Sequence, residues 1–310
     1  MQISLLLAHE IAQLFLILLA GFVLVRAGLL RAADSKVLSV ILVYLVIPCV
    51  IIDAFQIEDT PAIRAGLAVS FAAAAAIHLL FLVLTGLLRR FLGLDAIERA
   101  TAIYSNAGAL VIPLVQALLG QEYVIYSCAF IIVQLMLLWT HGSMILRGAG
   151  ALSWKAILTN VNLLSIAAGA VLYAGRIPLP AVLSGAMDDM GALMGPLGML
   201  LAGMAIAESP LRQLVCTPRY YLTAALRLVV YPLAALVLLW ATGMAALLPD
   251  GRAILMTVYL AAITPACTTI TSMVQLYGQD AGKSSALYVM STLLSIVTMP
   301  LMLAVFDWVI

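Results

Sequence analysis

Ser105-Asn106-Ala107-Gly108, followed by Pro113, interrupts an apolar stretch in the first half of this chain. Thr264-Pro265-Ala266-Cys267-Thr268-Thr269 interrupts another apolar stretch at the corresponding place in the second half. Polar groups and prolines at matching positions of two apolar segments are typical of the broken helices that bind substrate in secondary transporters. The two stretches therefore indicate a ligand site, provided that the surrounding chain lies in a membrane.

The composition places the chain in a membrane. Of its 310 residues, 65% are hydrophobic and 9% are charged, and the mean hydropathy is +1.18. Soluble domains carry about 25% charged residues, so lipid must replace water around most of this surface. The formal net charge of +1 argues against a nucleic-acid partner. The four cysteines and three histidines show neither metal-ligand spacing nor a hydrolase motif, which argues against an enzyme.

Ten segments are long and apolar enough to cross a bilayer, for which a helix needs about 20 residues. We therefore expect an all-α polytopic membrane protein whose helices span residues 8–26, 35–55, 63–90, 99–119, 122–146, 156–175, 186–207, 217–243, 252–276 and 281–308.

The Lys and Arg residues of the connecting loops predict the orientation. Eleven fall in one alternating set of loops and three in the other, while Arg227 lies inside a span. Because positive loops stay in the cytoplasm, the eleven-residue side is predicted to be cytoplasmic. Both termini then lie outside.

The two halves resemble each other weakly beyond the interruptions. Leu114-Val115-Gln116 is similar to Met273-Val274-Gln275, at an offset close to half the chain. Each half contains five spans, and five is an odd number, so the second half enters the membrane from the opposite side. We expect two inverted five-helix repeats, residues 1–155 and 156–310, in which the fourth and ninth helices are broken.

Helix ends in the two interruptions provide groups that bind an anion. We expect Pro113 and Pro265 each to end or begin a half-helix, with Thr264 as the N-cap residue before Pro265. A half-helix N-terminus carries free N–H groups and a partial positive charge, which favours a carboxylate without a basic side chain.

Several side chains are candidates for substrate binding. Asn106 contacts the substrate, satisfies the opposite broken helix or only caps the break. The hydroxyls near it either orient a carboxylate or bond to their own helix. The candidate substrate-binding residues are Ser105, Asn106, Gly108, Pro113, Thr264, Pro265, Thr268 and Thr269.

Other polar residues inside the spans are candidates for ion coupling. Gln116 and Gln275 either hold a cation or bond two helices together, and Asp53 is either interfacial or a proton or sodium site. Arg227 is expected to extend toward the cytoplasmic interface; the alternatives are a pair with Glu208 or attraction of the anion. His78 and His141 are expected to be buried and hydrogen-bonded, with proton relay as the alternative.

Several motifs resemble the auxin efflux carrier family of transporters. Asn106 to Leu114 resembles the motif of its fourth helix, and Thr264-Pro265-Ala266 with residues 275–280 resembles that of the ninth. Residues 43–48 and 291–301 are similar to its second and last helices, so the resemblance covers essentially the whole chain. The loop between the fifth and sixth spans is short, as in compact bacterial members.

The resemblance implies an inverted-repeat fold like that of bile acid/sodium symporters, with the broken helices crossing near the midplane. It implies a scaffold domain of helices 1, 2, 6 and 7, and a transport domain of helices 3–5 and 8–10 that moves as an elevator. It also implies a homodimer in the bacterial inner membrane that carries a mono- or dicarboxylate such as malonate.

Two other functions remain open at this stage. A cation-coupled antiporter needs acidic side chains at the crossing, where the interruptions contain none. A ligand-sensing membrane module needs a partner or an output domain. No cofactor is expected beyond a coupling Na⁺ or H⁺.

Overall fold

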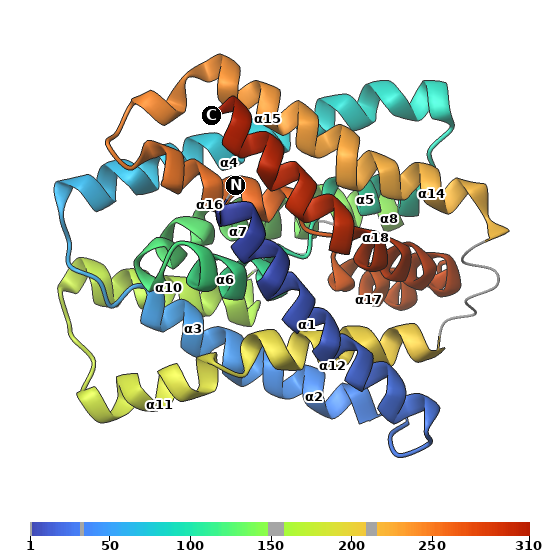
Figure 1. The fold of residues 1–310 in the computed structure, drawn as a ribbon, viewed down its shortest axis with the longest axis horizontal. Coiled ribbons are helices and arrows are strands. Elements are labelled where there is room, and N and C mark those ends of the chain that lie inside the picture. Colours follow the sequence, from blue (N-terminus) through green and yellow to red (C-terminus); the bar gives the residue numbers. More distant parts are fainter. Residues whose placement is uncertain (1, 32–33, 148–157, 209–215) are drawn as a thin grey trace.

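The computed structural model describes residues 2–31, 34–147, 158–208 and 216–310, and this part of the chain is almost entirely helical (Figure 1). The first half contains α1 (Gln2–Arg26), α2 (Ser35–Ile41), α3 (Ile47–Ala54), α4 (Pro61–Leu92), α5 (Ala96–Ile103), α6 (Ala107–Leu118), α7 (Val124–Leu137) and α8 (Ser143–Arg147). π-Helical turns join α2 to α3 at Leu42–Val46, and α7 to α8 at Leu138–Gly142.

The second half contains α10 (Val161–Gly175), α11 (Ala181–Gly191), α12 (Met194–Glu208), α14 (Pro218–Ala225), α15 (Tyr231–Thr242), α16 (Gly251–Ile263), α17 (Thr268–Leu276) and α18 (Ala281–Val309). A third π-helical turn, Leu226–Val230, joins α14 to α15. The boundary expected between residues 155 and 156 lies outside the described residues.

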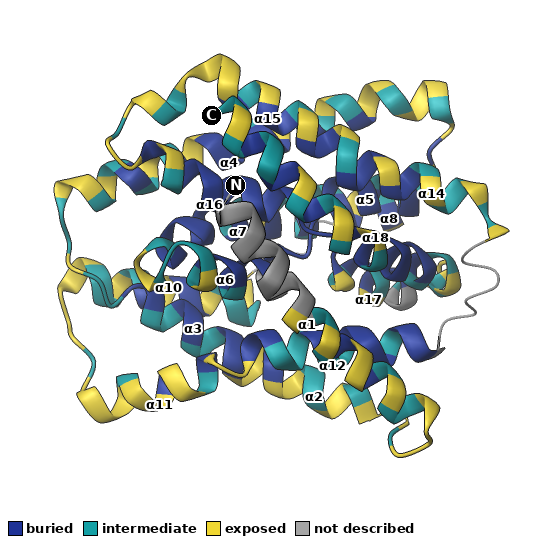
Figure 2. Cartoon of the chain, in the orientation of Figure 1, coloured by how far each residue is buried: buried dark blue, intermediate teal, exposed yellow. Residues whose placement is uncertain are grey.

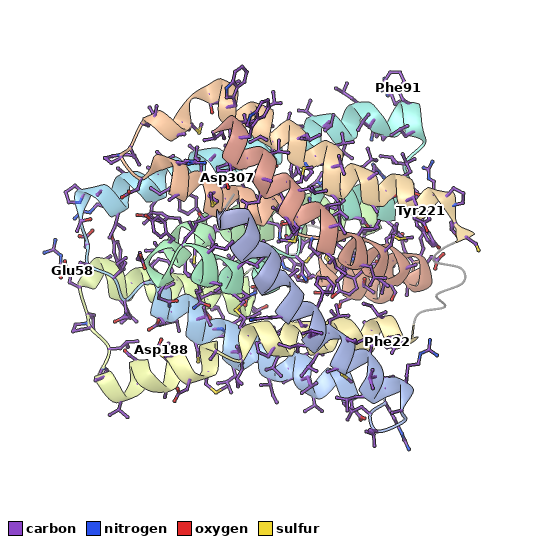
Figure 3. The ribbon with its side chains drawn as sticks, in the orientation of Figure 1. Phe22, Glu58, Phe91, Asp188, Tyr221 and Asp307 are labelled. Carbon is purple, nitrogen blue, oxygen red and sulfur yellow. The ribbon has the colours of Figure 1, made fainter. Side chains whose placement is uncertain are left out.

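Six helical segments of the described chain are long and apolar enough to cross a membrane: Ser35–Ala54, Pro61–Leu92, Gln121–Arg147, Ala181–Ala207, Pro218–Thr242 and Ala281–Val309. Shorter apolar helices occupy Phe15–Arg26, Val161–Gly175 and Gly251–Ile263. Large apolar side chains project outward, such as Phe91, which is 84% exposed (Figure 3). Such a surface suits lipid. Ten crossings, and the orientation of the termini, stay predictions.

Two groups of helices can be distinguished, although α1 and α12 of the first also contact α6 and α18 of the second. In the first group, α1 lies along α12, and α3 packs against α10 and α11. In the second, α4, α7 and α16 contact one another, while α18 packs against α14 and α17. Residues of α7 and α16 are mostly buried, whereas α11 is largely exposed (Figure 2). The centre of the molecule therefore lies around α7 and α16.

Small residues allow α1 and α12 to approach closely. A Cβ atom at Gly203 of α12 would overlap the carbonyl oxygen of Leu18 and the backbone nitrogen of Phe22 in α1. On the other side of the contact, a Cβ at Gly21 would overlap the carbonyl oxygen of Leu200. The two backbones thus touch directly, as expected for small residues at helix contacts in membranes.

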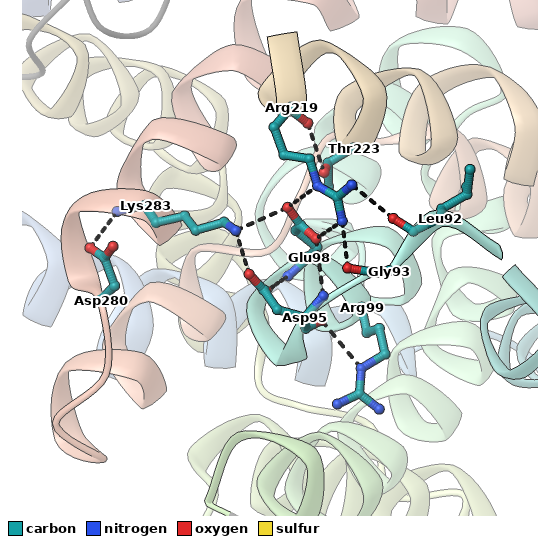
Figure 4. Close-up of polar contacts among 9 residues, drawn as sticks. All are labelled: Leu92, Gly93, Asp95, Glu98, Arg99, Arg219, Thr223, Asp280 and Lys283. Carbon is teal, nitrogen blue, oxygen red and sulfur yellow. Dashed lines mark hydrogen bonds and ion pairs between the residues drawn. The ribbon is translucent and has the colours of Figure 1, made fainter. Parts of the chain in front are cut away.

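An ion-pair cluster joins four helices of the second group near one end (Figure 4). Glu98, only 1% exposed, accepts hydrogen bonds from Arg219 at 2.7 and 2.8 Å and from Lys283 at 2.9 Å. Arg219 begins α14 and also binds carbonyl oxygens at the end of α4, and Lys283 begins α18. Asp95 and Glu98 form a capping box on α5. The cluster therefore fixes the ends of α4, α5, α14 and α18 together.

Gly203→Ala should destabilise the protein by about 1–3 kcal/mol, because the two backbones must separate to admit the methyl group. Gly185→Ala in α11 is the matched control, since a Cβ there meets no atom within 4 Å, and the change should be neutral or stabilising by up to about 1 kcal/mol. Thermal unfolding in detergent measures both. Equal effects in the two variants would contradict the close contact.

Glu98 should make stability depend on pH under acidic conditions. Burial alone raises the pKa of Glu98, but hydrogen bonds from Arg219 and Lys283 outweigh it and lower the pKa from 4.5 to about 2. A carboxyl with a lowered folded-state pKa stabilises above its unfolded pKa, and this contribution disappears as the pH falls through the folded value. The unfolding free energy should therefore decrease between about pH 5 and pH 2.

In Glu98→Gln this decrease should be smaller, because the side chain no longer titrates. The variant should also be less stable near neutral pH by about 1–3 kcal/mol. Thermal unfolding of both proteins across this pH range measures the difference. Parallel pH profiles would show that Glu98 does not contribute as described.

Candidate functional site

The two interruptions predicted from the sequence are present, and they pair with each other. The chain leaves helical geometry at 104–106, between α5 and α6, and at 264–267, between α16 and α17. The backbone N–H of Asn106 donates to the carbonyl oxygen of Pro265 at 2.8 Å, and that of Cys267 donates to Tyr104 at 3.1 Å. The interruptions thus form a short antiparallel bridge. Each break supplies backbone partners that the other needs in a membrane interior.

Side chains from α7 and α18 complete the pairing. Gln134 of α7 accepts hydrogen bonds from the backbone N–H of Ser105 at 2.9 Å and its hydroxyl at 2.7 Å, and donates to its carbonyl oxygen at 2.8 Å. The hydroxyl of Ser291 in α18 accepts from Ala266 N–H at 3.1 Å. The buried Ser105 hydroxyl therefore bonds to Gln134 of α7, and not to its own helix as the alternative to substrate binding assumed. Sequence reasoning missed Gln134, although it is a lone amide in an apolar span.

Arg227 binds the C-terminal ends of α5 and α16, where these helices stop at the breaks. Its side chain is 0% exposed, and its guanidinium donates to the carbonyl oxygens of Thr264 at 3.0 Å, of Ala102 and Ile103 at 3.2 Å each, and of Ala262. The prediction that Arg227 extends to the cytoplasmic interface is wrong, because these unpaired carbonyls offer a buried guanidinium a full set of acceptors. The side chain of Glu208 lies outside the described residues.

The prolines do not mark the half-helix ends in the predicted way. Pro113 lies inside α6, which continues to Leu118, so the prediction that it ends or begins a half-helix is wrong. Thr264 is the C-cap of α16 rather than an N-cap, and its hydroxyl donates to Ala261. Pro265 lies in the non-helical segment, where its carbonyl accepts from Asn106. The pairing of the breaks, rather than proline alone, sets the helix ends.

Two cavities lie beside the N-terminal ends of α6 and α17. One, of about 390 Å³, lies among α7, α10 and the π-helical turn of the α2–α3 helix; the other, of about 300 Å³, lies among α2, α12 and α18. Asn106, Thr268 and Thr269 line both cavities, while Gln134 and Cys267 line the first. The structure therefore brings together three of the eight candidate substrate-binding residues.

The two cavities have uncharged walls of mixed apolar and polar residues. None of the described residues that line them is acidic, basic or histidine. The α6 helix begins at Ala107, with Gly108 in its first turn, and α17 begins at Thr268, so two helix N-termini open onto this space. The side-chain amide of Asn106 forms no hydrogen bond to another described residue. An anion placed here meets the partial positive charge of two helix N-termini.

The ion-coupling candidates lie away from this space. Gln116 donates to Gln121 at 2.5 Å, and Gln121 donates to Asp53 at 2.9 Å, in an exposed chain at the far ends of α6 and α3. Asp53 is half-buried there and also lies against the Asp188 carboxyl. Gln275 lies in the last turn of α17, and its side chain is outside the described part. The structure thus joins Gln116 to Asp53 but separates both from Asn106.

The two span histidines are hydrogen-bonded, as predicted. His78 is 0% exposed and its Nδ1 bonds to the carbonyl oxygen of Ala74 at 2.7 Å, while its Nε2 has no partner among the described residues. The Nδ1 of His141 bonds to the hydroxyl of Tyr104 at 2.9 Å. Neither histidine lines the cavities at Asn106.

Gln134→Leu should destabilise the fold by about 2–5 kcal/mol, because three buried polar groups of Ser105 lose their partner. Gln116→Leu removes an amide from the exposed chain and should cost less than about 1 kcal/mol. Thermal or denaturant unfolding in detergent compares the two variants. Similar losses in both would contradict the role of Gln134 at the break.

Comparison with known families agrees with this geometry. A model of a family described as "Membrane transport protein" matches residues 6–303, which is nearly the whole chain and includes both interruptions. No curated protein matches the sequence significantly. Because the family match extends over the complete helical body, the resemblance that rested on short motifs is confirmed. This membrane protein therefore belongs to the auxin efflux carrier family of membrane transport proteins.

Proposed function

We propose that this protein is a secondary active transporter that moves a small organic anion, a mono- or dicarboxylate such as malonate, across the bacterial inner membrane. The observation that carries this proposal is the shared wall of the two cavities. Asn106, Thr268 and Thr269 stand at the starts of α6 and α17, where both cavities meet. A carboxylate there is bound by backbone N–H groups, hydroxyls and one amide.

The charge distribution supports an anion rather than a metal cation. Two helix N-termini contribute about half a positive unit each, and no acidic side chain is found among the described lining residues. A cation antiporter requires carboxylates at this place. Asp53 is half-buried but lies at the far end of α3, so it does not supply them.

The position of the cavities supports alternating access. Their walls come from both groups of helices: α6, α7, α17 and α18 on one side, and α2, α10 and α12 on the other. We propose that α4–α8 and α14–α18 form the transport domain, and that α1–α3 and α10–α12 form the scaffold of an elevator. In this proposal ten spans form two inverted repeats with both termini outside, and two copies of the chain form a homodimer.

Asn106→Ala, and separately the double variant Thr268→Val with Thr269→Val, should reduce uptake of the preferred carboxylate by about tenfold or more, equivalent to about 1.4 kcal/mol of lost binding. Uptake of labelled malonate, malate, lactate and indole acetate into proteoliposomes identifies that substrate. Thr242→Val is the control, because its hydroxyl bonds only within the end of α15, far from the cavities.

Uptake that is unchanged in both variants would remove these residues from the binding site. Saturable binding of a carboxylate without flux would favour the ligand-sensing alternative over transport. Thermal unfolding of each variant separates loss of binding from loss of fold.

A further inference from the structure

Arg227 sits in a binding site made of backbone oxygens. Its Nε and both Nη atoms donate to four carbonyl oxygens from the last residues of α5 and α16, and its side chain is 0% exposed. Within the described chain, no carboxylate forms an ion pair with it. Clustered backbone carbonyls without a counter-ion are also the ligands that proteins use for dehydrated cations such as K⁺.

The charge of Arg227 matches the charge of the helix ends around it. A helix C-terminus carries about half a negative unit, so two of them together carry about one. One guanidinium neutralises this sum. The positive charge is therefore explained by α5 and α16, which end here, and not by an acidic side chain.

Arg227 is not placed to bind the transported anion. It does not belong to the described residues that line either cavity. Its remaining neighbours include the ring of Phe81, whose centre lies 5.8 Å from the guanidinium carbon. The π-helical turn Leu226–Val230 carries the side chain on α14–α15, a helix separate from both broken ones.

We propose that the Arg227 guanidinium is the resident cation of the broken-helix pair, occupying a carbonyl site that a free monovalent cation fills when the side chain is removed. Arg227 is thus a positioning residue, which holds the ends of α5 and α16 so that α6 and α17 start beside each other. The tethered charge makes this site independent of sodium. The expectation that transport is independent of sodium rests on the proposed function. The expected effects on the melting temperature do not.

Melting temperatures of the unmodified protein in different salts test whether the site is independent of sodium. The melting temperature of purified protein, without substrate, should be the same in sodium, potassium and choline chloride at equal ionic strength. A saturable rise in sodium alone, of more than about 3 °C, would overturn the proposal.

Chemical rescue tests whether a free cation fills the carbonyl site when the Arg227 side chain is removed. Arg227→Ala should lower the melting temperature, and guanidinium ion at low millimolar concentration should raise it again, in proportion to the logarithm of its concentration over its dissociation constant. Arg252→Ala is the control, because Arg252 also binds a carbonyl oxygen but its side chain is 49% exposed, and water can replace it. Absence of rescue in Arg227→Ala, or equal rescue in Arg252→Ala, would overturn the proposal.

Two conservative variants keep the test decisive where Arg227→Ala does not yield folded protein. Arg227→Lys keeps the charge and loses the guanidinium fork, while Arg227→Gln keeps two N–H donors and loses the charge. The Lys variant should melt at least about 5 °C above the Gln variant. Equal melting temperatures would show that charge is not what the site requires.

Uptake in proteoliposomes gives a final and separate result. Substrate uptake by the unmodified protein should change less than about twofold when choline replaces sodium on both sides, and a tenfold loss, about 1.4 kcal/mol, would overturn sodium independence. Failure of the uptake assay for every carboxylate would count against the proposed function, while the melting measurements would still decide the role of Arg227.

Discussion

A backbone N–H or C=O group that loses its helical partner inside a membrane must find another one within the protein. The paired breaks at 104–106 and 264–267 are the place where this constraint governs the structure. Each break provides hydrogen-bond partners for backbone groups of the other, through the bridge between Asn106 and Pro265. Gln134, Ser291 and Arg227 bond to further backbone groups, and all three come from helices outside the broken pair.

The same arrangement separates the two kinds of helix end. The C-terminal ends of α5 and α16 meet the buried guanidinium, whereas the N-terminal ends of α6 and α17 meet the cavities. Negative dipole ends are therefore neutralised inside the protein, and positive ends are left for a ligand. The anion site that we propose therefore needs no basic side chain beside Asn106, Thr268 and Thr269.

Helix ends and helix contacts elsewhere are fixed by other means. The Glu98 cluster fixes four helix ends with buried charge-assisted hydrogen bonds. Gly203 lets α1 and α12 touch along their backbones in the other group of helices. The cavities are lined by helices of both groups, which is the arrangement that the proposed alternating access requires.

The sequence by itself determined that the chain is helical and lies in a membrane, and that helices break near Asn106 and Pro265, because hydropathy and local polarity are properties of neighbouring residues. It also indicated Asn106, Thr268 and Thr269 as candidate substrate-binding residues. Only the tertiary structure decided that Pro113 lies inside a helix, that Thr264 ends one, and that the Ser105 hydroxyl donates a hydrogen bond to Gln134. Arg227 depended on tertiary structure most, because its four acceptors come from segments 35 to 125 residues away, and no local pattern contains them.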